Sequence, residues 1–166
     1  MIEVNERIEV PSAPRTVWSV LSDPHEVVGC VPGAALGAEQ EDGSFDATLT
    51  VKFGPAKVAF RARVALELDA AGMSGRVLAR GKDDKGGTRI RSNLTFKVEE
   101  RAEPAGSVIP IEAQVEIAGK LASLVEGGAT LVVKRMTKEF TERLAARCAE
   151  QALITHHPSP GKGREA

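Results

Sequence analysis

The first part of the chain has the hydrophobic pattern of one strand followed by two short helices. Residues 2–10 (IEVNERIEV) alternate apolar and polar side chains, as a strand with one buried face does. Further on, Val17, Trp18 and Leu21 recur at helical spacing and form one apolar face. The stretch DPHE at residues 23–26 then supplies an N-cap, a proline at the first helical position and an acid at the third. The pattern therefore predicts a strand and two short helices.

Residues 36–119 have the period of two that is typical of a β-sheet. The alternation is interrupted by turn signals, namely EDG, GP, AAG, DDKGG and EPAG, so five or six antiparallel strands in a meander are expected. One face of these strands is apolar, and the other carries arginines among acids, which is typical of a solvated surface. The inward positions are predicted to be Phe45, Ala47, Leu49, Val51, Phe53, Val58, Phe60, Ala62, Val64, Leu66, Leu68, Leu94, Phe96, Val98, Ile111, Ala113, Val115 and Ile117.

The last part of the chain returns to helical spacing at Leu121. A helix of about 30 residues is predicted, followed from residue 151 by a tail rich in Pro, Gly and charge that is expected to be disordered. Residues 1–150 are therefore expected to form one domain. The apolar stripe of the helix is predicted to contain Leu121, Leu124, Val125, Leu131, Val132, Met136, Phe140 and Leu144.

Composition narrows the class of protein. A chain of 166 residues with 42% hydrophobic and 27% charged residues is typical of one soluble globular domain. A net charge of -1, one Trp and no Tyr argue against binding to nucleic acid. The chain has no apolar run of the roughly 20 residues that a membrane span needs, and its first residues do not resemble a signal peptide. A cytoplasmic protein is expected.

Residue types that carry catalysis or bind metals are sparse and scattered. Of the three histidines, only His25 precedes the expected tail, and it lies in the first turn of a predicted short helix. Asp83 and Asp84 belong to a turn, where adjacent acids are normally solvated. Cys30 and Cys148 lack a C-x-x-C spacing and are expected to be free thiols. No catalytic set, metal site or cofactor is predicted.

Three stretches resemble one protein family. They are VWSVLSDPHEVVGCVPGA at residues 17–34, VKFGPAKVAFRARVALE at residues 51–67, and IAGKLASLVEGG, which leads into EFTERL. Together they are similar to the CoxG family of carbon monoxide dehydrogenase subunits, over about residues 2–150. This resemblance implies the α+β helix-grip fold of the START-like, or SRPBCC, superfamily, in which a curved antiparallel sheet wraps around a long C-terminal helix and two short helices follow the first strand.

The resemblance also implies a function. It implies a non-catalytic accessory protein of a molybdenum-containing dehydrogenase, with an apolar cavity suited to a lipid or quinone and a role in linking the enzyme to the membrane. The tail offers only Leu153 and Ile154 as membrane-seeking residues and Lys162 and Arg164 as cations, too few for a stable anchor. The expected location is the cytoplasm, with at most peripheral contact with the inner face of the plasma membrane.

Small inward side chains also predict a space beneath the long helix. The chain is only 4% aromatic, and its inward positions include Ala47, Ala62 and Ala113. Gly127 and Gly128, which weaken a helix, are predicted to form a hinge or portal above this space, unless the helix begins only after them. The predicted ligand-binding residues are Trp18, Leu21, Phe53, Phe60, Phe96, Leu121, Leu124, Val125, Gly127, Gly128, Val132, Met136 and Phe140.

Two other functions stay open at this point. The fold also hosts cyclases and dehydratases, and an enzyme would need titratable groups inside the cavity. An interaction protein that chaperones or tethers a dehydrogenase complex would use the arginine-rich sheet face or the tail, with any cavity incidental. The candidate residues are Glu6, Ser92, Arg135 and Glu139 for the enzyme, and Arg61, Arg63, Arg89 and Arg91 for the interaction protein.

Overall fold

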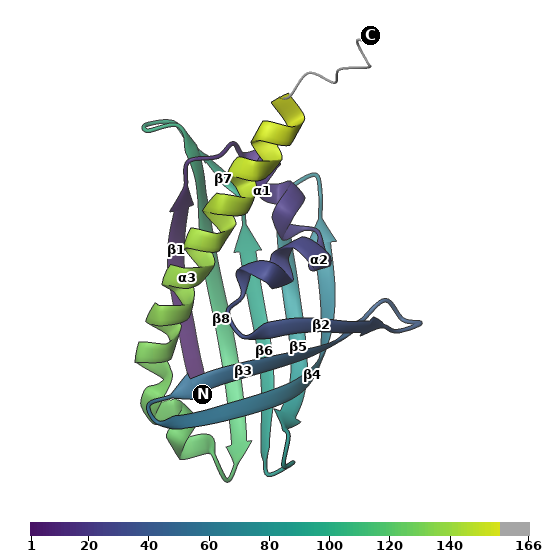
Figure 1. Cartoon of the computed structure of the whole chain (residues 1–166), viewed down its shortest axis with the longest axis vertical. Coiled ribbons are helices and arrows are strands. Elements are labelled where there is room, and N and C mark those ends of the chain that lie inside the picture. Colours follow the sequence, from purple (N-terminus) through teal and green to yellow (C-terminus); the bar gives the residue numbers. More distant parts are fainter. Residues whose placement is uncertain (157–166) are drawn as a thin grey trace.

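The computed structural model describes residues 1–156, which form one antiparallel sheet and a long helix (Figure 1). The strands are β1 (Ile2–Val10), β2 (Ala34–Glu39), β3 (Phe45–Phe53), β4 (Ala56–Asp69), β5 (Ser74–Asp83), β6 (Thr88–Lys97), β7 (Glu99–Arg101) and β8 (Gly106–Gly119). The helices are α1 (Pro14–Leu21), α2 (Pro24–Val27), the 3-10 turn η1 (Val28–Cys30) and α3 (Ala122–His156). The predicted fold class is confirmed.

The strands run in the order β1-β8-β6-β5-β4-β3-β2, with the short β7 added beside β8. The meander therefore spans the sheet, while α1 and α2 carry the chain from β1 at one edge to β2 at the other. β2, β3 and β4 turn across the other strands, so that the sheet curls around α3 (Figure 1). Of the predicted inward residues, Leu68 alone is exposed. It lies near the end of β4, and its exposed fraction is 41%.

Helix α3 begins before the two glycines and passes through them without a break. The alternative that the helix starts only after Gly128 is therefore wrong. Its start is fixed by the sheet, because the buried Thr88 hydroxyl accepts a hydrogen bond of 2.8 Å from the backbone N–H of Leu121. The helix extends to His156, so residues 151–156 of the expected tail are helical, and the remainder of that tail lies outside the described residues.

The apolar stripe of α3 is narrower than the sequence predicts. Val125, Val132 and Leu144 are buried, but Leu131 is 75% exposed and Leu124 is 38% exposed. Adjacent helical residues are about 100° apart around the axis, so Leu124 and Leu131 share a face that turns away from the one holding Val125 and Val132. Their placement on the buried stripe was wrong.

The buried apolar residues form two separate clusters. The first joins β1, α1, η1, the ends of β6 and β8, and the C-terminal half of α3. The second joins the β3–β4 hairpin to the N-terminal half of α3. The first cluster contains Ile8, Val10, Val17, Val20, Leu21, Cys30, Phe96, Val98, Ile109, Leu144 and Cys148, and the second contains Val51, Phe53, Val58, Phe60, Val125 and Val132.

The two thiols of the first cluster give the fold a pH dependence in the alkaline range. Burial raises the pKa of the Cys148 thiol from 9.0 to about 11, because the thiolate is poorly solvated there, and it also raises the pKa of Cys30. A raised folded-state pKa contributes stability that is complete below pH 9.0 and is lost as the pH rises toward about 11. Urea unfolding should therefore show a loss of roughly 2–3 kcal/mol from Cys148 over this range. The Cys148→Ala variant should lack that component, and an equal loss in the variant would contradict the assignment.

Candidate functional site between the two core clusters

Inward-facing side chains are unevenly buried along β1, β3 and β4, whereas Ala113 in the middle of β8 is buried. In β1, Ile8 and Val10 are buried, whereas Val4 and Glu6 are half-buried. β3 and β4 repeat this pattern, since their shared hairpin is buried and the inward positions farther along, such as Ala62, are half-buried. Solvent therefore reaches the inner face of the sheet between the two clusters.

The strand register brings the half-buried positions together. Val64, Ala79, Ser92 and Val115 lie side by side on four successive strands. We call the region of the inner face around these half-buried residues the central gap. The residues that line it and belong to neither core cluster are Val4, Glu6, Ala47, Ala62, Val64, Leu66, Ala79, Ser92 and Val115.

The gap has a simple physical origin. A strongly curled sheet leaves a groove, and a straight helix can close the sides of that groove without filling its middle. Here α3 makes its main sheet contacts with β1, β3 and β8, which come from both sides of the curled sheet. The side chains between them, such as Ala62, Ala79 and Ser92, are too small to reach the helix.

A hollow of about 320 Å³ lies beside α3, next to Val51 and Met136 of the second cluster, and it is the candidate mouth of the site. The loop before β2 approaches β3 closely there. Only glycine suits position 33, because its φ is +81° and a Cβ would collide with the carbonyl oxygen of Thr50. Arg135 spans the opening and donates from Nη2 to the Lys52 carbonyl at 2.9 Å. The hollow is lined by Pro32, Gly33, Thr50, Val51, Lys52, Arg135, Met136 and Glu139.

The structure places most of the predicted ligand-binding residues at the ends of the central gap. Trp18 packs on Phe96, with ring centroids 6.1 Å apart. The residues at the first cluster are Trp18, Leu21, Phe96 and Phe140, and those at the second are Phe53, Phe60, Leu121, Val125, Val132 and Met136. Leu124 and Gly127 lie instead on the exposed side of α3. The small residues in the middle of the strands were not among the predicted ligand contacts, although strand alternation had placed Ala47 and Ala62 on the inner face.

The two glycines of α3 have different surroundings. A Cβ on Gly128 would lie 3.1 Å from Cδ1 of Phe53, so this glycine allows the helix to approach β3 closely. A Cβ on Gly127 would meet nothing within 4 Å. Packing thus explains Gly128 and leaves Gly127 unexplained.

Alanine substitutions should separate these two roles. Gly127→Ala should stabilise the protein by roughly 0.5–1 kcal/mol, because it removes backbone freedom from the unfolded chain without creating a contact. Gly128→Ala should stabilise the protein less than Gly127→Ala does, or should destabilise it, because the side chain of Phe53 must move to admit the new Cβ. Urea unfolding measures both. If Gly127 acts as a hinge, Gly127→Ala should also slow the uptake of an apolar ligand, whereas unchanged uptake would exclude the hinge.

Arg135 and Glu139 both line the hollow beside α3, whereas the other two polar candidates for an enzyme lie apart from each other on the sheet. Glu6 faces Ile111 in the register of β1 and β8, whereas Ser92 faces Val115 in the register of β6 and β8. Arg135 lies at the mouth, and Glu139 is 3.7 Å from Arg143 in an ion pair on α3. Asp23 caps α2 as predicted, but Glu26 pairs with Arg147 at 3.0 Å and so ties α2 to α3.

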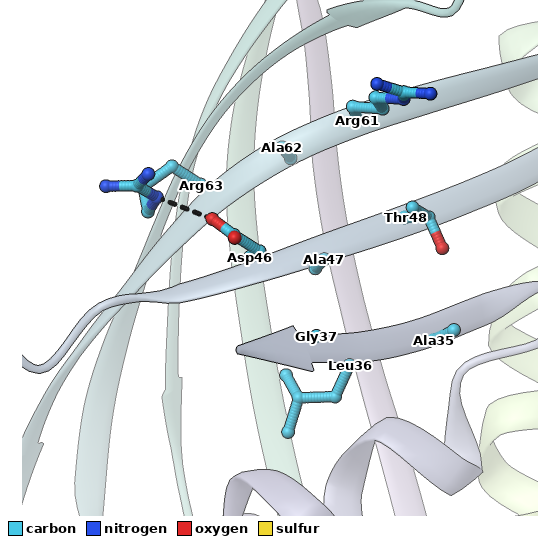
Figure 2. Close-up of a pocket in the computed structure, with 9 residues that line it drawn as sticks. All are labelled: Ala35, Leu36, Gly37, Asp46, Ala47, Thr48, Arg61, Ala62 and Arg63. Carbon is cyan, nitrogen blue, oxygen red and sulfur yellow. Dashed lines mark hydrogen bonds and ion pairs between the residues drawn. The ribbon is translucent and has the colours of Figure 1, made fainter. Parts of the chain in front are cut away.

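A second hollow, of about 460 Å³, lies on the outer face of the sheet over β2, β3 and β4 (Figure 2). Arg61 and Arg63 stand beside it, and Arg63 Nε donates to Asp46 at 2.9 Å. Most of the residues that line this hollow alternate outward on their strands, although three that alternate inward, Leu36, Ala47 and Ala62, line it as well.

A curled antiparallel sheet, a long C-terminal helix across it and two short helices after β1 define a helix-grip protein. Solved structures share this fold. A conserved protein from Geobacillus kaustophilus is 19% identical, with 90% of this chain and 96% of that chain covered and a TM-score of 0.76. A protein from Thermus thermophilus is 15% identical, with 90% and 98% covered and a TM-score of 0.66. The Zhui aromatase/cyclase from a Streptomyces species is 14% identical, with 94% and 96% covered and a TM-score of 0.58.

The sequence identifies the family within this fold. Residues 6–149 match the family model of CoxG, a subunit of carbon monoxide dehydrogenase, and the chain belongs to that family. Among curated proteins, no sequence matches significantly. Within residues 1–156, no helix is long and apolar enough to cross a membrane.

Proposed function

We propose that this protein is a non-catalytic accessory module that holds an apolar small molecule, a lipid or a quinone, in the central gap. The observation that carries the proposal is the row of half-buried inward residues between two closed clusters. A solid interior would bury these side chains as fully as those of the clusters. A bound hydrocarbon chain would complete their burial.

The chemistry of the walls favours an apolar ligand with a polar end. Apart from Glu6 and Ser92, the lining of the central gap is aliphatic. Burial contributes roughly 25 cal/mol per Å² of apolar surface, so a chain that buries about 200 Å² would gain about 5 kcal/mol. At the mouth, Lys52 and Arg135 offer donors to the oxygens of a quinone or an ester. Entry beside Met136 is therefore proposed in place of entry at the glycines.

The proposed partner follows from the family. The family name refers to a component of carbon monoxide dehydrogenase, and we propose that the protein serves an enzyme of that type, a molybdenum-containing hydroxylase. Its proposed location is the cytoplasm, with peripheral contact with the inner face of the plasma membrane while it exchanges the ligand.

Organic extraction of purified protein followed by mass spectrometry tests the proposal. An isoprenoid or acyl compound should be recovered in near-stoichiometric amount, and stripped protein should take up a quinone with an isoprenoid tail. Protein that is empty as purified and takes up neither that quinone nor a fatty acid would overturn the carrier function. If a bound compound is recovered chemically altered in a way that depends on Glu6, the protein is an enzyme instead.

A further inference from the structure

The outer face of the sheet carries a block of cations that the central gap does not explain. In the strand register, Arg61 of β4 lies opposite Lys82 of β5, which lies opposite Arg89 of β6. The adjacent outward row repeats the arrangement. All of these side chains are exposed. We call this block the basic patch, and it consists of Arg61, Arg63, Arg80, Lys82, Arg89 and Arg91.

One row of the patch is balanced by acids at its ends. Asp46 lies opposite Arg63 on one side, and Glu116 lies opposite Arg91 on the other. Among residues 1–153, the pair between Arg63 and Asp46 is the only ion pair that a member of the patch makes.

The other row has no such balance. Thr48 and Ala118 flank Arg61, Lys82 and Arg89 in the register. Cross-strand neighbours have Cβ atoms roughly 4.5–5.5 Å apart, and like charges at that distance destabilise a sheet. The fold therefore carries a repulsive arrangement that its own acids do not relieve.

The patch borders a hollow that can admit a protruding group. The outward residues that line it are Ala35, Gly37, Asp46 and Thr48 on β2 and β3, and Arg61 and Arg63 on β4 (Figure 2). Arg61 and Arg63 thus line the β4 side of the hollow of about 460 Å³, where Arg63 holds Asp46 and Arg61 makes no ion pair with any of residues 1–153.

We propose that the basic patch docks an acidic surface of a partner protein, whose carboxylates enter this hollow. The planar fork of Arg matches a carboxylate with two parallel hydrogen bonds, and a partner's acids would relieve the repulsion within the patch. A recessed site suits protruding Asp and Glu side chains better than the flat layer of lipid headgroups. Membrane-binding surfaces also combine cations with exposed apolar side chains. The exposed large apolar residues of residues 1–153 all lie outside the patch: Met1, Leu68, Leu124, Leu131 and Leu153.

Fluorescence anisotropy with a labelled oligoglutamate peptide tests the proposal on the full-length chain. The test variant is R61Q/K82Q/R89Q, and the matched control is R7Q/R15Q/K134Q, which removes the same charge from exposed residues elsewhere. The natural protein and the control should bind the peptide, with an affinity that falls as salt rises. The test variant should bind about tenfold more weakly, with a shallower salt dependence.

Two further measurements complete the test. The melting temperature of the test variant should equal or exceed that of the natural protein, because substitution relieves repulsion within the sheet. Co-sedimentation with phosphatidylglycerol vesicles should show no loss of binding specific to the test variant. Equal peptide binding by both variants, a lower melting temperature of the test variant, or patch-dependent binding to the vesicles but not to the peptide would each overturn the proposal.

Discussion

The double variant Ala62→Phe/Ala79→Phe is expected to lose its apolar ligand while keeping its fold. Both alanines line the central gap, belong to neither core cluster and are half-buried. Phenylalanine would fill the space that a ligand is proposed to occupy. Retention of the extracted compound should fall about tenfold or more, because a gap filled by side chains cannot bury a ligand. The measurement is the amount of compound recovered by organic extraction per mole of purified variant.

The stability of the same variant gives an independent check. In a solid interior, added bulk typically costs 1–3 kcal/mol per site. In an open gap, the new rings bury apolar surface, so the free energy of unfolding should change by less than about 1 kcal/mol or rise. The matched control is Ala65→Phe/Ala118→Phe, on the outer face of β4 and β8, which should retain the ligand. Severe destabilisation of the test variant with a stable control would show that no gap exists.

Leu144→Ala is expected to be among the most destabilising single substitutions in this protein. Leu144 is 0% exposed and joins α3 to the first core cluster. Truncation of a fully buried leucine removes its transfer free energy and leaves a cavity, so the free energy of unfolding should fall by about 2–5 kcal/mol. Urea or thermal unfolding measures this loss.

Leu131 provides the matched control on the same helix. It is 75% exposed, so Leu131→Ala should change the stability by no more than about 0.5 kcal/mol. Similar losses in the two variants would contradict the assignment of the buried face of α3. A large loss at Leu131 alone would indicate that another molecule covers this leucine.

The sheet was predictable because its signal is local. Side chains alternate strictly along a strand, so the face of Phe60 or Ala62 follows from sequence position once the turns are recognised. The exception in burial is Leu68, the second-to-last residue of β4, which is 41% exposed. The buried face of the long helix was harder to predict. Its apolar residues cover a wide sector of the helix surface, and the sequence does not show how much of that sector the sheet covers. Leu124 and Leu131 were misplaced for this reason.

The candidate site was only partly predictable. Large apolar residues such as Trp18, Phe53 and Phe96 were predicted to contact the ligand, since large side chains dominate both cores and ligand walls. In the structure they close the two core clusters, and smaller residues line the space between them. The sequence pattern along a strand does not show which of its inward residues the helix covers and which it leaves uncovered.

By itself, the sequence determined the order of the elements, the inward and outward faces of the strands, and the family. Those features depend on side-chain periodicity and on short stretches of residues, which are properties of neighbours along the chain. Only the tertiary structure decided where α3 crosses the sheet, which glycine packs on Phe53, and which cations stand side by side on the outer face. These depend on strand register and sheet curvature, which bring together residues that are far apart in the sequence.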